Sequence, residues 1–159
     1  MPAGGLTVDI TIIPSPTIIV SAFGQLADLV GRFKEPFREA IVDVMAPSIG
    51  TNFDVGGRPS WQPLSEATLP KKTQYGGGGV LVLSGALSQT AGQLDEWDIG
   101  EDSATMGLSD SVWYGRVHEE GTDKIPQREW ALFQAEDVDK IEQIFGDWMS
   151  EQVEKALWL

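Results

Sequence analysis

The sequence contains no cysteine and a single histidine, His118, and both shortages exclude chemistry. Without cysteine the chain has no disulfide framework, no thiolate metal site and no thiol nucleophile, which fits a reducing cytoplasm. A metal site at His118 would need further ligands, and no second histidine offers one. We therefore expect neither a metal nor another cofactor.

Long hydrophobic runs are also missing. No apolar run approaches the roughly 18 residues that a membrane span requires, so we expect no contact with a bilayer. No basic region precedes an apolar run at the start of the sequence, which disfavours a secretory signal. The apolar content of 42% and the charged content of 22% are typical of a soluble globular protein, and 159 residues suit one domain over residues 1–159.

Positive charge is scarce: 11 basic residues face 24 acidic ones, for a net charge of −13. Between Asp95 and Asp123 there are nine acids, and Arg116 is the only lysine or arginine. This charge repels phosphate backbones, so we expect no stable binding of nucleic acid. Two interpretations stay open: a solvated acidic surface that keeps the protein soluble, or a channel wall past which DNA slides. The candidates for a channel wall are Asp95, Glu96, Asp98, Glu101 and Asp102.

The N-terminal part predicts extended structure. In "LTVDITII", residues 6–13, apolar and polar side chains alternate with the period of a strand that buries one face. The prolines of "PSP" at 14–16 interrupt this pattern, because proline cannot donate to a sheet. "TIIV", residues 17–20, is either a second short strand or the lead into a helix. We expect an extended β segment over about residues 1–22.

Two amphipathic helical regions enclose the middle of the chain. From Leu26 to Phe53 apolar residues recur at steps of three and four, and Pro36 and Pro47 predict kinks or a split, with Pro36 near the start of the second helix. The glycine pair at 56–57 ends this region. A second apolar stripe between Val138 and Leu157 predicts a C-terminal helix.

The middle of the chain predicts short strands. Glycine or Asp/Ser turn signals separate five segments, at about residues 80–85, 86–92, 93–100, 103–110 and 111–121. Spacing this tight favours hairpins, and on the last strand Tyr114, Arg116 and His118 would share one face. The predicted fold class is α+β: an antiparallel β-meander packed against the long N-terminal helix and the C-terminal amphipathic helix.

A run of four glycines lies between the first helical region and the strands. A phosphate cradle would need a lysine followed by serine or threonine, and neither follows here. We therefore predict a flexible loop over about residues 72–80. Its glycines are Gly76, Gly77, Gly78 and Gly79.

An enzyme hypothesis would make His118 a general base, oriented by Glu119 or Glu120, with Ser84 or Ser88 as the nucleophile. Neighbouring residues on a strand point to opposite faces, so Glu119 would be badly placed to orient His118. No Gly-x-Ser-x-Gly turn is present to hold a nucleophile. We instead expect His118 to be hydrogen-bonded to nearby backbone, and we assign no catalytic residue.

Five short motifs occur in a fixed order along the chain. They are Phe53; Trp61, Pro63 and Leu64 with Thr68, Lys71 and Lys72; Ser84, Gly85 and Leu87; Tyr114, His118 and Gly121; and Pro126, Arg128 and Trp130. In this order the chain resembles the phage virion morphogenesis (tail completion) proteins of Mu-like phages, from about residue 24 onward. It departs from that family at Glu129, where a second proline is frequent, and at Glu120, where an aromatic or apolar residue is common.

The resemblance implies a non-enzymatic, structural role in the virion, after assembly in the host cytoplasm. Such proteins form a ring of identical subunits, a hexamer or a dodecamer, between the portal or its adaptor and the tail terminator or tail tube. A ring needs two different patches of each copy to meet, and Arg128 is suited to a neighbour's carboxylate. The candidate contact residues are Trp61, Tyr114, Arg116, His118, Arg128 and Trp130.

Two other functions are carried as alternatives. One is a tail terminator or an assembly chaperone of the tail. An assembly chaperone would be a monomer or dimer without a role in finished particles. The other is a hydrolase that depends on His118, for which His118→Ala abolishes turnover and leaves assembly intact.

Overall fold

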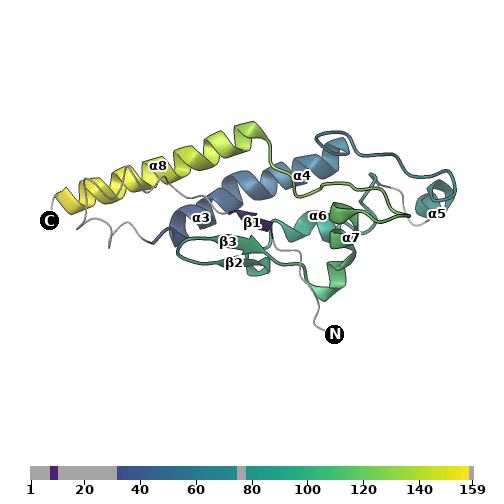
Figure 1. Cartoon of the computed structure of the whole chain (residues 1–159), viewed down its shortest axis with the longest axis horizontal. Coiled ribbons are helices and arrows are strands. Elements are labelled where there is room, and N and C mark those ends of the chain that lie inside the picture. The colour runs from purple at the N-terminus through teal and green to yellow at the C-terminus, as the bar shows by residue number, and fades with distance from the viewer. Residues whose placement is uncertain (1–7, 11–31, 75–77, 158–159) are drawn as a thin grey trace.

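The computed structural model describes residues 8–10, 32–74 and 78–157, with only the backbone of residues 8–10 and 156–157. Two long helical segments lie side by side along an elongated molecule (Figure 1). The first comprises α3 (Lys34–Ala40), η1 (Ile41–Met45) and α4 (Ala46–Val55), which follow one another without a break. The second is α8 (Ala135–Leu157), which packs on α3 and η1. The parts of the predicted β segment and first helix at residues 1–7 and 11–31 lie outside the described residues.

The two prolines act differently on the first helical segment. Pro36 lies in the first turn of α3, near a helix start as predicted, where a missing N–H costs nothing because that donor has no helical partner. Pro47 is the second residue of α4, just after the π-helical η1, whose wider turns accommodate the lost donor. The helix therefore continues through Pro47 without splitting. It ends at Gly56, which takes the left-handed conformation with φ 77°, as the glycine pair predicts.

A small antiparallel sheet lies beside the helices. It has the order β1-β3-β2, where β1 is Val8–Ile10, β2 is Trp97–Ile99 and β3 is Ala104–Met106. Met106 pairs with Trp97 on one side and with Val8 on the other. Two of the five predicted strand segments, those at 93–100 and 103–110, thus contain a strand, and the α+β class is confirmed.

The strands predicted at 80–92 and 111–121 are wrong. Residues 86–90 form α6 (Ala86–Thr90), and the later stretch forms η3 (Asp110–Val112) and α7 (Tyr114–Glu120). The strand prediction at 111–121 depended on three alternating residues, one of them Gly115, which has no preference for strands. In the fold, Gly115 is buried where α7 touches Leu87 and Trp130, and that contact requires helical spacing.

The hydrophobic core lies between the two long helical segments and the sheet. Aromatic rings join the helices, with Phe145 of α8 at 5.8 Å from Phe33 and 5.0 Å from Phe37 between ring centroids. On the predicted apolar stripe of α8, Ile141 and Phe145 are buried, whereas Val138 at the start of the helix is exposed. In the part of the chain that the structure describes, no helix is long and apolar enough to cross a membrane.

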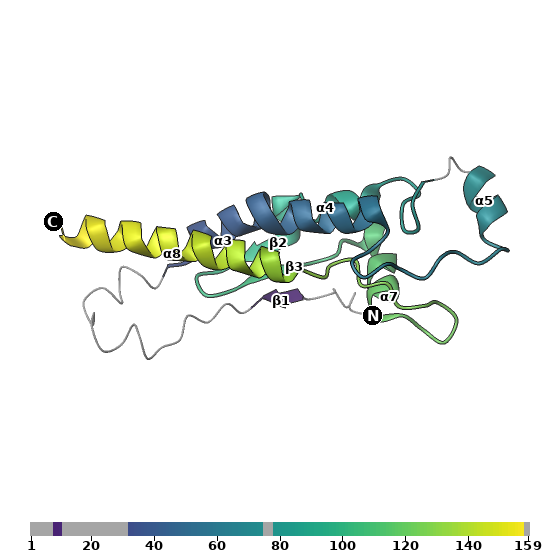
Figure 2. The same ribbon diagram turned by 90° about the horizontal axis from the view of Figure 1, so that it is seen from above.

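The short helices α5 (Leu69–Gln74) and α7 lie towards one end of the molecule. Figure 2 shows α5 beyond the end of α4 and α7 beside that end, while the last turns of α8 extend past the start of α3 at the opposite end. The short η2 (Leu94–Glu96) leads into β2.

Candidate functional site

Three of the five motifs contribute an aromatic residue to one buried cluster, made by Phe53, Trp61 and Trp130, and Trp130 has no exposed surface. The ring of Phe53 lies 5.9 Å from that of Trp130 and 5.5 Å from that of Trp61 between centroids. The indole N–H of Trp130 donates to the carbonyl of Gly115 at 2.9 Å, and that of Trp61 donates to the carbonyl of Glu129 at 3.2 Å. Both tryptophans are therefore internal anchors, which corrects the expectation that they form subunit contacts.

Arg128 is also used inside the subunit. Only 4% of its surface is exposed. Its Nε donates to the carbonyl of Gln62 at 3.0 Å, its Nη2 to that of Pro63 at 3.3 Å, and its backbone N–H to that of His118 at 2.7 Å. Burial lowers the pKa of the guanidinium. Arg128 thus pins the 62–63 loop to α7, and the predicted pairing with a neighbour's carboxylate is corrected.

Glu119 of α7 completes a buried framework of hydrogen bonds, which also includes the side chains of Trp61, Arg128 and Trp130. Its Oε2 accepts hydrogen bonds from the backbone N–H of Trp130 at 2.8 Å and of Ala131 at 3.2 Å. Burial raises the pKa of the carboxyl, against the opposite effect of these two hydrogen bonds. The side chain therefore holds the segment that leads into α8 and does not orient His118. Spacing along the sequence offered no signal for this role.

A polar cluster between α4 and α8 was also missed. Asn52, fully buried, donates to the carbonyls of Trp130 at 3.0 Å and Leu132 at 2.8 Å, and it accepts a hydrogen bond from Arg58 at 2.7 Å. Ser48 donates to Asp137. Such pairs bring together residues far apart in the sequence, so no local pattern predicts them. Together with the framework they hold the start of α8 in place.

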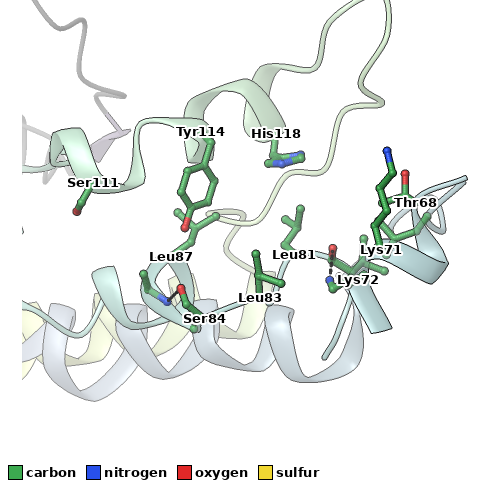
Figure 3. Close-up of a pocket in the computed structure, with 14 residues that line it drawn as sticks. Thr68, Lys71, Lys72, Leu81, Leu83, Ser84, Leu87, Ser111, Tyr114 and His118 are labelled. Carbon is green, nitrogen blue, oxygen red and sulfur yellow. Dashed lines mark hydrogen bonds between the residues drawn. The ribbon is translucent and has the colours of Figure 1, made fainter. Parts of the chain in front are cut away.

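Next to the framework lies an open pocket of about 570 Å³, between α5, the turn after Gly79, α6 and α7 (Figure 3). Its apolar lining includes Leu64, Val80, Leu81, Leu83 and Leu87. Its polar lining includes Thr68, Lys71, Lys72, Ser84, Tyr114 and His118. Tyr114 and His118 are one helical turn apart on α7, so the helix places both side chains on the pocket. The predicted strand also put these two residues on one face.

Within the described part of the chain, the imidazole of His118 lacks the hydrogen bond that was expected for it. Its Nδ1 is buried and has no hydrogen-bond partner among the described residues. The expectation that nearby backbone satisfies this nitrogen is therefore corrected, and the contact with nearby backbone is made instead by the His118 carbonyl, which accepts a hydrogen bond from the N–H of Arg128. Burial lowers the pKa of His118, and the positive charges of Arg128 and Lys72 lower it further. Both effects favour the neutral form of the imidazole.

Lys72 joins the pocket to the end of the glycine run. Its ammonium donates to the carbonyl of Gly79 and, at 2.9 Å, to that of Val80. Burial and the charge of Arg128 lower its pKa. Gly76 and Gly77 lie outside the described residues, and Gly78 has a φ of 102°. Residues 72–74 of the predicted loop belong instead to α5, and Gly79 and Val80 at the end of that loop contact this helix.

Only some of the residues that the hydrolase hypothesis requires lie together in this pocket. Ser84 lines the same pocket as His118, but the described residues show no hydrogen bond between them, and the backbone N–H of Ala86 donates to the Ser84 hydroxyl at 3.3 Å. Ser88 does not line the pocket, and its hydroxyl donates to the carbonyl of Gly85 at 2.9 Å. No serine–histidine–carboxylate relay is assembled within residues 32–74 and 78–157.

The remaining candidates lie on the surface. Arg116 is exposed, and its Nε donates to Glu120 one turn later at 2.9 Å. Of the predicted channel residues, Asp95, Asp98, Glu101 and Asp102 are exposed and Glu96 is half-buried, on or beside the β2–β3 hairpin. Their place in a channel stays a prediction. Over the described parts of the chain, no group of three or more acidic or histidine side chains is arranged to hold a metal ion.

Comparison with known protein families, with curated proteins and with solved structures finds no match to this chain.

Proposed function

We propose that this chain is a structural subunit of the phage head–tail junction that assembles into a closed ring between the portal or its adaptor and the tail. One observation carries the proposal: residues from the short motifs behind the resemblance meet in the fold. Phe53 and Trp61 pack beside Trp130, Arg128 holds the loop after Trp61, and α7 lies against both. Contact between residues this far apart in the sequence is the arrangement that a shared fold behind the motifs would produce, and it supports the resemblance.

The chemistry of this cluster supports a structural role. Its polar side chains are occupied in hydrogen bonds to backbone: those of Arg128 with the 62–63 loop, and that of Glu119 with the segment before α8. A general acid or base needs a polar group within reach of a substrate. These groups instead hold loops in place, which is what a rigid building block requires.

The distribution of surface supports self-association. Large exposed apolar side chains surround the pocket end: Leu83 with 61% of its surface exposed, Trp113 with 65% and Leu69 with 50%. Exposed apolar surface of this kind marks contact sites in soluble proteins. The acidic hairpin would face the genome in the assembled ring, where its negative charge prevents DNA from adhering.

The test combines the mass of the assembly with its presence in particles. Native mass spectrometry and electron microscopy of the purified chain should show one closed ring of six or twelve subunits. Antibody labelling should place it at the neck of mature particles. A monomer or dimer that is absent from finished particles would overturn the proposal in favour of an assembly chaperone, and labelling at the far end of the neck beside the tail tube would favour a tail terminator.

His118→Ala separates this proposal from the hydrolase. If the chain is a connector, particles made with the variant carry the same neck, or fail to join, and no turnover depends on the residue. An esterase or amidase activity of the purified chain that disappears in His118→Ala, with unchanged assembly, would support the hydrolase and contradict a purely structural role.

A further inference from the structure

We propose that the pocket between α5, α6 and α7 receives the acidic and apolar end of α8 from a second copy of this chain. The inference rests on the ring assembly proposed above and names the contact that would join its subunits. The pocket, the helix end and their places in the fold each contribute an observation.

The pocket combines apolar lining with positive charge. It is lined by two lysines, Lys71 and Lys72, and by no carboxylate. Arg128 lies close enough to affect the titration of both Lys72 and His118. In a chain with a net charge of −13, a site without acids that holds lysines is unusual, and it attracts a partner that is apolar and negatively charged.

The rim of the pocket carries apolar surface that the isolated subunit leaves uncovered. Leu83 lines the pocket and has 61% of its surface exposed, and Trp113 lies directly before Tyr114 with 65% exposed. A partner that covers the pocket would bury this apolar surface.

The distal part of α8 has the complementary chemistry. Phe145 is buried against α3, but Met149 and Val153, which continue the same stripe at steps of four residues, are only half-buried. Glu154 is exposed next to Val153, whereas Glu151 pairs with Lys155 at 2.8 Å on the other side of the helix, and the stripe continues in sequence with Leu157. An amphipathic helix of this kind binds by laying its apolar face into a groove.

The places of the two surfaces allow a ring. The helices α5 and α7, which contribute to the pocket, lie towards one end of the elongated subunit, and the last turns of α8 lie at the other end in both views (Figures 1 and 2). A subunit therefore cannot fill its own pocket, and the contact between copies is head-to-tail. Repetition of such a contact closes into a ring when the rotation between copies permits it.

Disulfide trapping tests the contact directly, because the chain has no cysteine of its own. The full-length double variant Leu83→Cys with Val153→Cys is oxidised mildly and analysed by non-reducing gel. We expect a ladder of covalent multimers, since each copy has one cysteine at each end of the contact. The matched control combines Val55→Cys, which is 59% exposed and outside the pocket, with Val153→Cys, and should give no ladder.

Charge reversal gives a second, independent test. Lys71→Glu and Glu154→Lys change exposed side chains, and each should weaken subunit association by about tenfold or more, measured by sedimentation velocity on the full chain. The double variant should recover part of the loss. Lys124→Glu and Glu142→Lys are the controls, at exposed positions outside the pocket and in the middle of α8. Thermal unfolding of every variant establishes that the subunit itself is intact.

The outcomes separate this inference from the ring proposal. Rings that form equally well with all variants, without a ladder, overturn the docking of α8 and leave the ring intact. A product that stops at the covalent dimer indicates a two-fold contact and overturns the head-to-tail arrangement. A wild-type chain that remains monomeric overturns both proposals.

Discussion

The cluster around Trp130 and the pocket beside it are built from the same short helix, yet they differ in almost every property. Gly115 and Glu119 of α7 face the cluster, where the carbonyl of Gly115 accepts a hydrogen bond from Trp130 and the carboxylate of Glu119 accepts from Trp130 and Ala131. Tyr114 and His118 face the pocket, where the buried imidazole nitrogen has no partner among the described residues. Steps of four residues divide the helix between a closed region and an open one.

The contrast between the two regions shows which motif residues belong to the interior of the subunit and which are available to a partner. Bulky aromatic and arginine side chains are typical of interfaces, but here Trp61, Arg128 and Trp130 are buried within the subunit. The surface available to a partner consists instead of leucines, lysines and the edge of α7. Substitutions in the closed region should therefore reduce stability, and those in the open region should reduce assembly.

The largest effect on stability is expected for Trp130→Ala. Removal of a fully buried indole leaves a cavity and removes its hydrogen bond to the Gly115 carbonyl, which should cost about 3–5 kcal/mol in the free energy of unfolding. The control Trp113→Ala removes a tryptophan that is 65% exposed and should change stability by less than about 1 kcal/mol. Urea unfolding measures both, and equal losses would contradict the division into two regions.

Glu119→Ala should have the next largest effect. It leaves the backbone N–H groups of Trp130 and Ala131 without their acceptor, at a cost of about 1–3 kcal/mol. Glu119→Gln retains an oxygen acceptor and removes a charge that burial disfavours, so its loss should be clearly smaller. If the two variants unfold at the same urea concentration as the wild type, the carboxylate does not hold this segment.

A pair of glycine substitutions should act with opposite signs. Gly121 has a φ of 71°, and a Cβ there would lie 2.9 Å from the backbone nitrogen of Gln127, so Gly121→Ala should destabilise by more than about 1 kcal/mol. Gly146 lies in α8 with nothing near its missing Cβ, and Gly146→Ala should stabilise by about 0.5–1 kcal/mol. Melting temperatures that shift in the same direction would be the contrary result.

The smallest effect is a pH dependence that belongs to the open region. Because burial lowers the pKa of His118 in the folded chain, the unfolded chain takes up a proton first as the pH falls below about 6.5. Stability is therefore lost with falling pH in the wild type, and this contribution is absent in His118→Asn. Unfolding between pH 8 and 5 should show the variant gaining relative to the wild type. A relative gain by the wild type would mean that the imidazole has an acidic partner.

Local pattern was sufficient where an element is long or has a clear turn. Steps of three and four residues over Phe33–Phe53 and over Ile141–Val153 predicted the two helical regions, and Gly56 predicted where the first one ends. The alternation at Ala104 and Met106 predicted β3, with both side chains buried. In these stretches many residues agree with a single period, so local propensity and packing favour the same structure.

The residues of the candidate site could not be placed in this way. Three alternating residues between 111 and 121 fit a strand as well as a helix, and a chain segment of that length carries too little pattern to decide. Whether Arg128 faces a neighbour or its own 62–63 loop depends on carbonyls more than sixty residues away in the sequence. The position of His118 in the wall of the pocket likewise depends on the packing of α5 and α6 near α7.

The amino-acid sequence by itself determined the strongly acidic charge, the absence of cysteine chemistry, the two amphipathic helical regions and the α+β class. These properties are sums over many residues or repeats of one period. Only the tertiary structure decided that α7 is a helix, that Trp130 and Arg128 are internal, and that an apolar, lysine-lined pocket stays open. Burial and hydrogen bonding are settled by which distant segments pack together, and no single stretch of the chain contains that information.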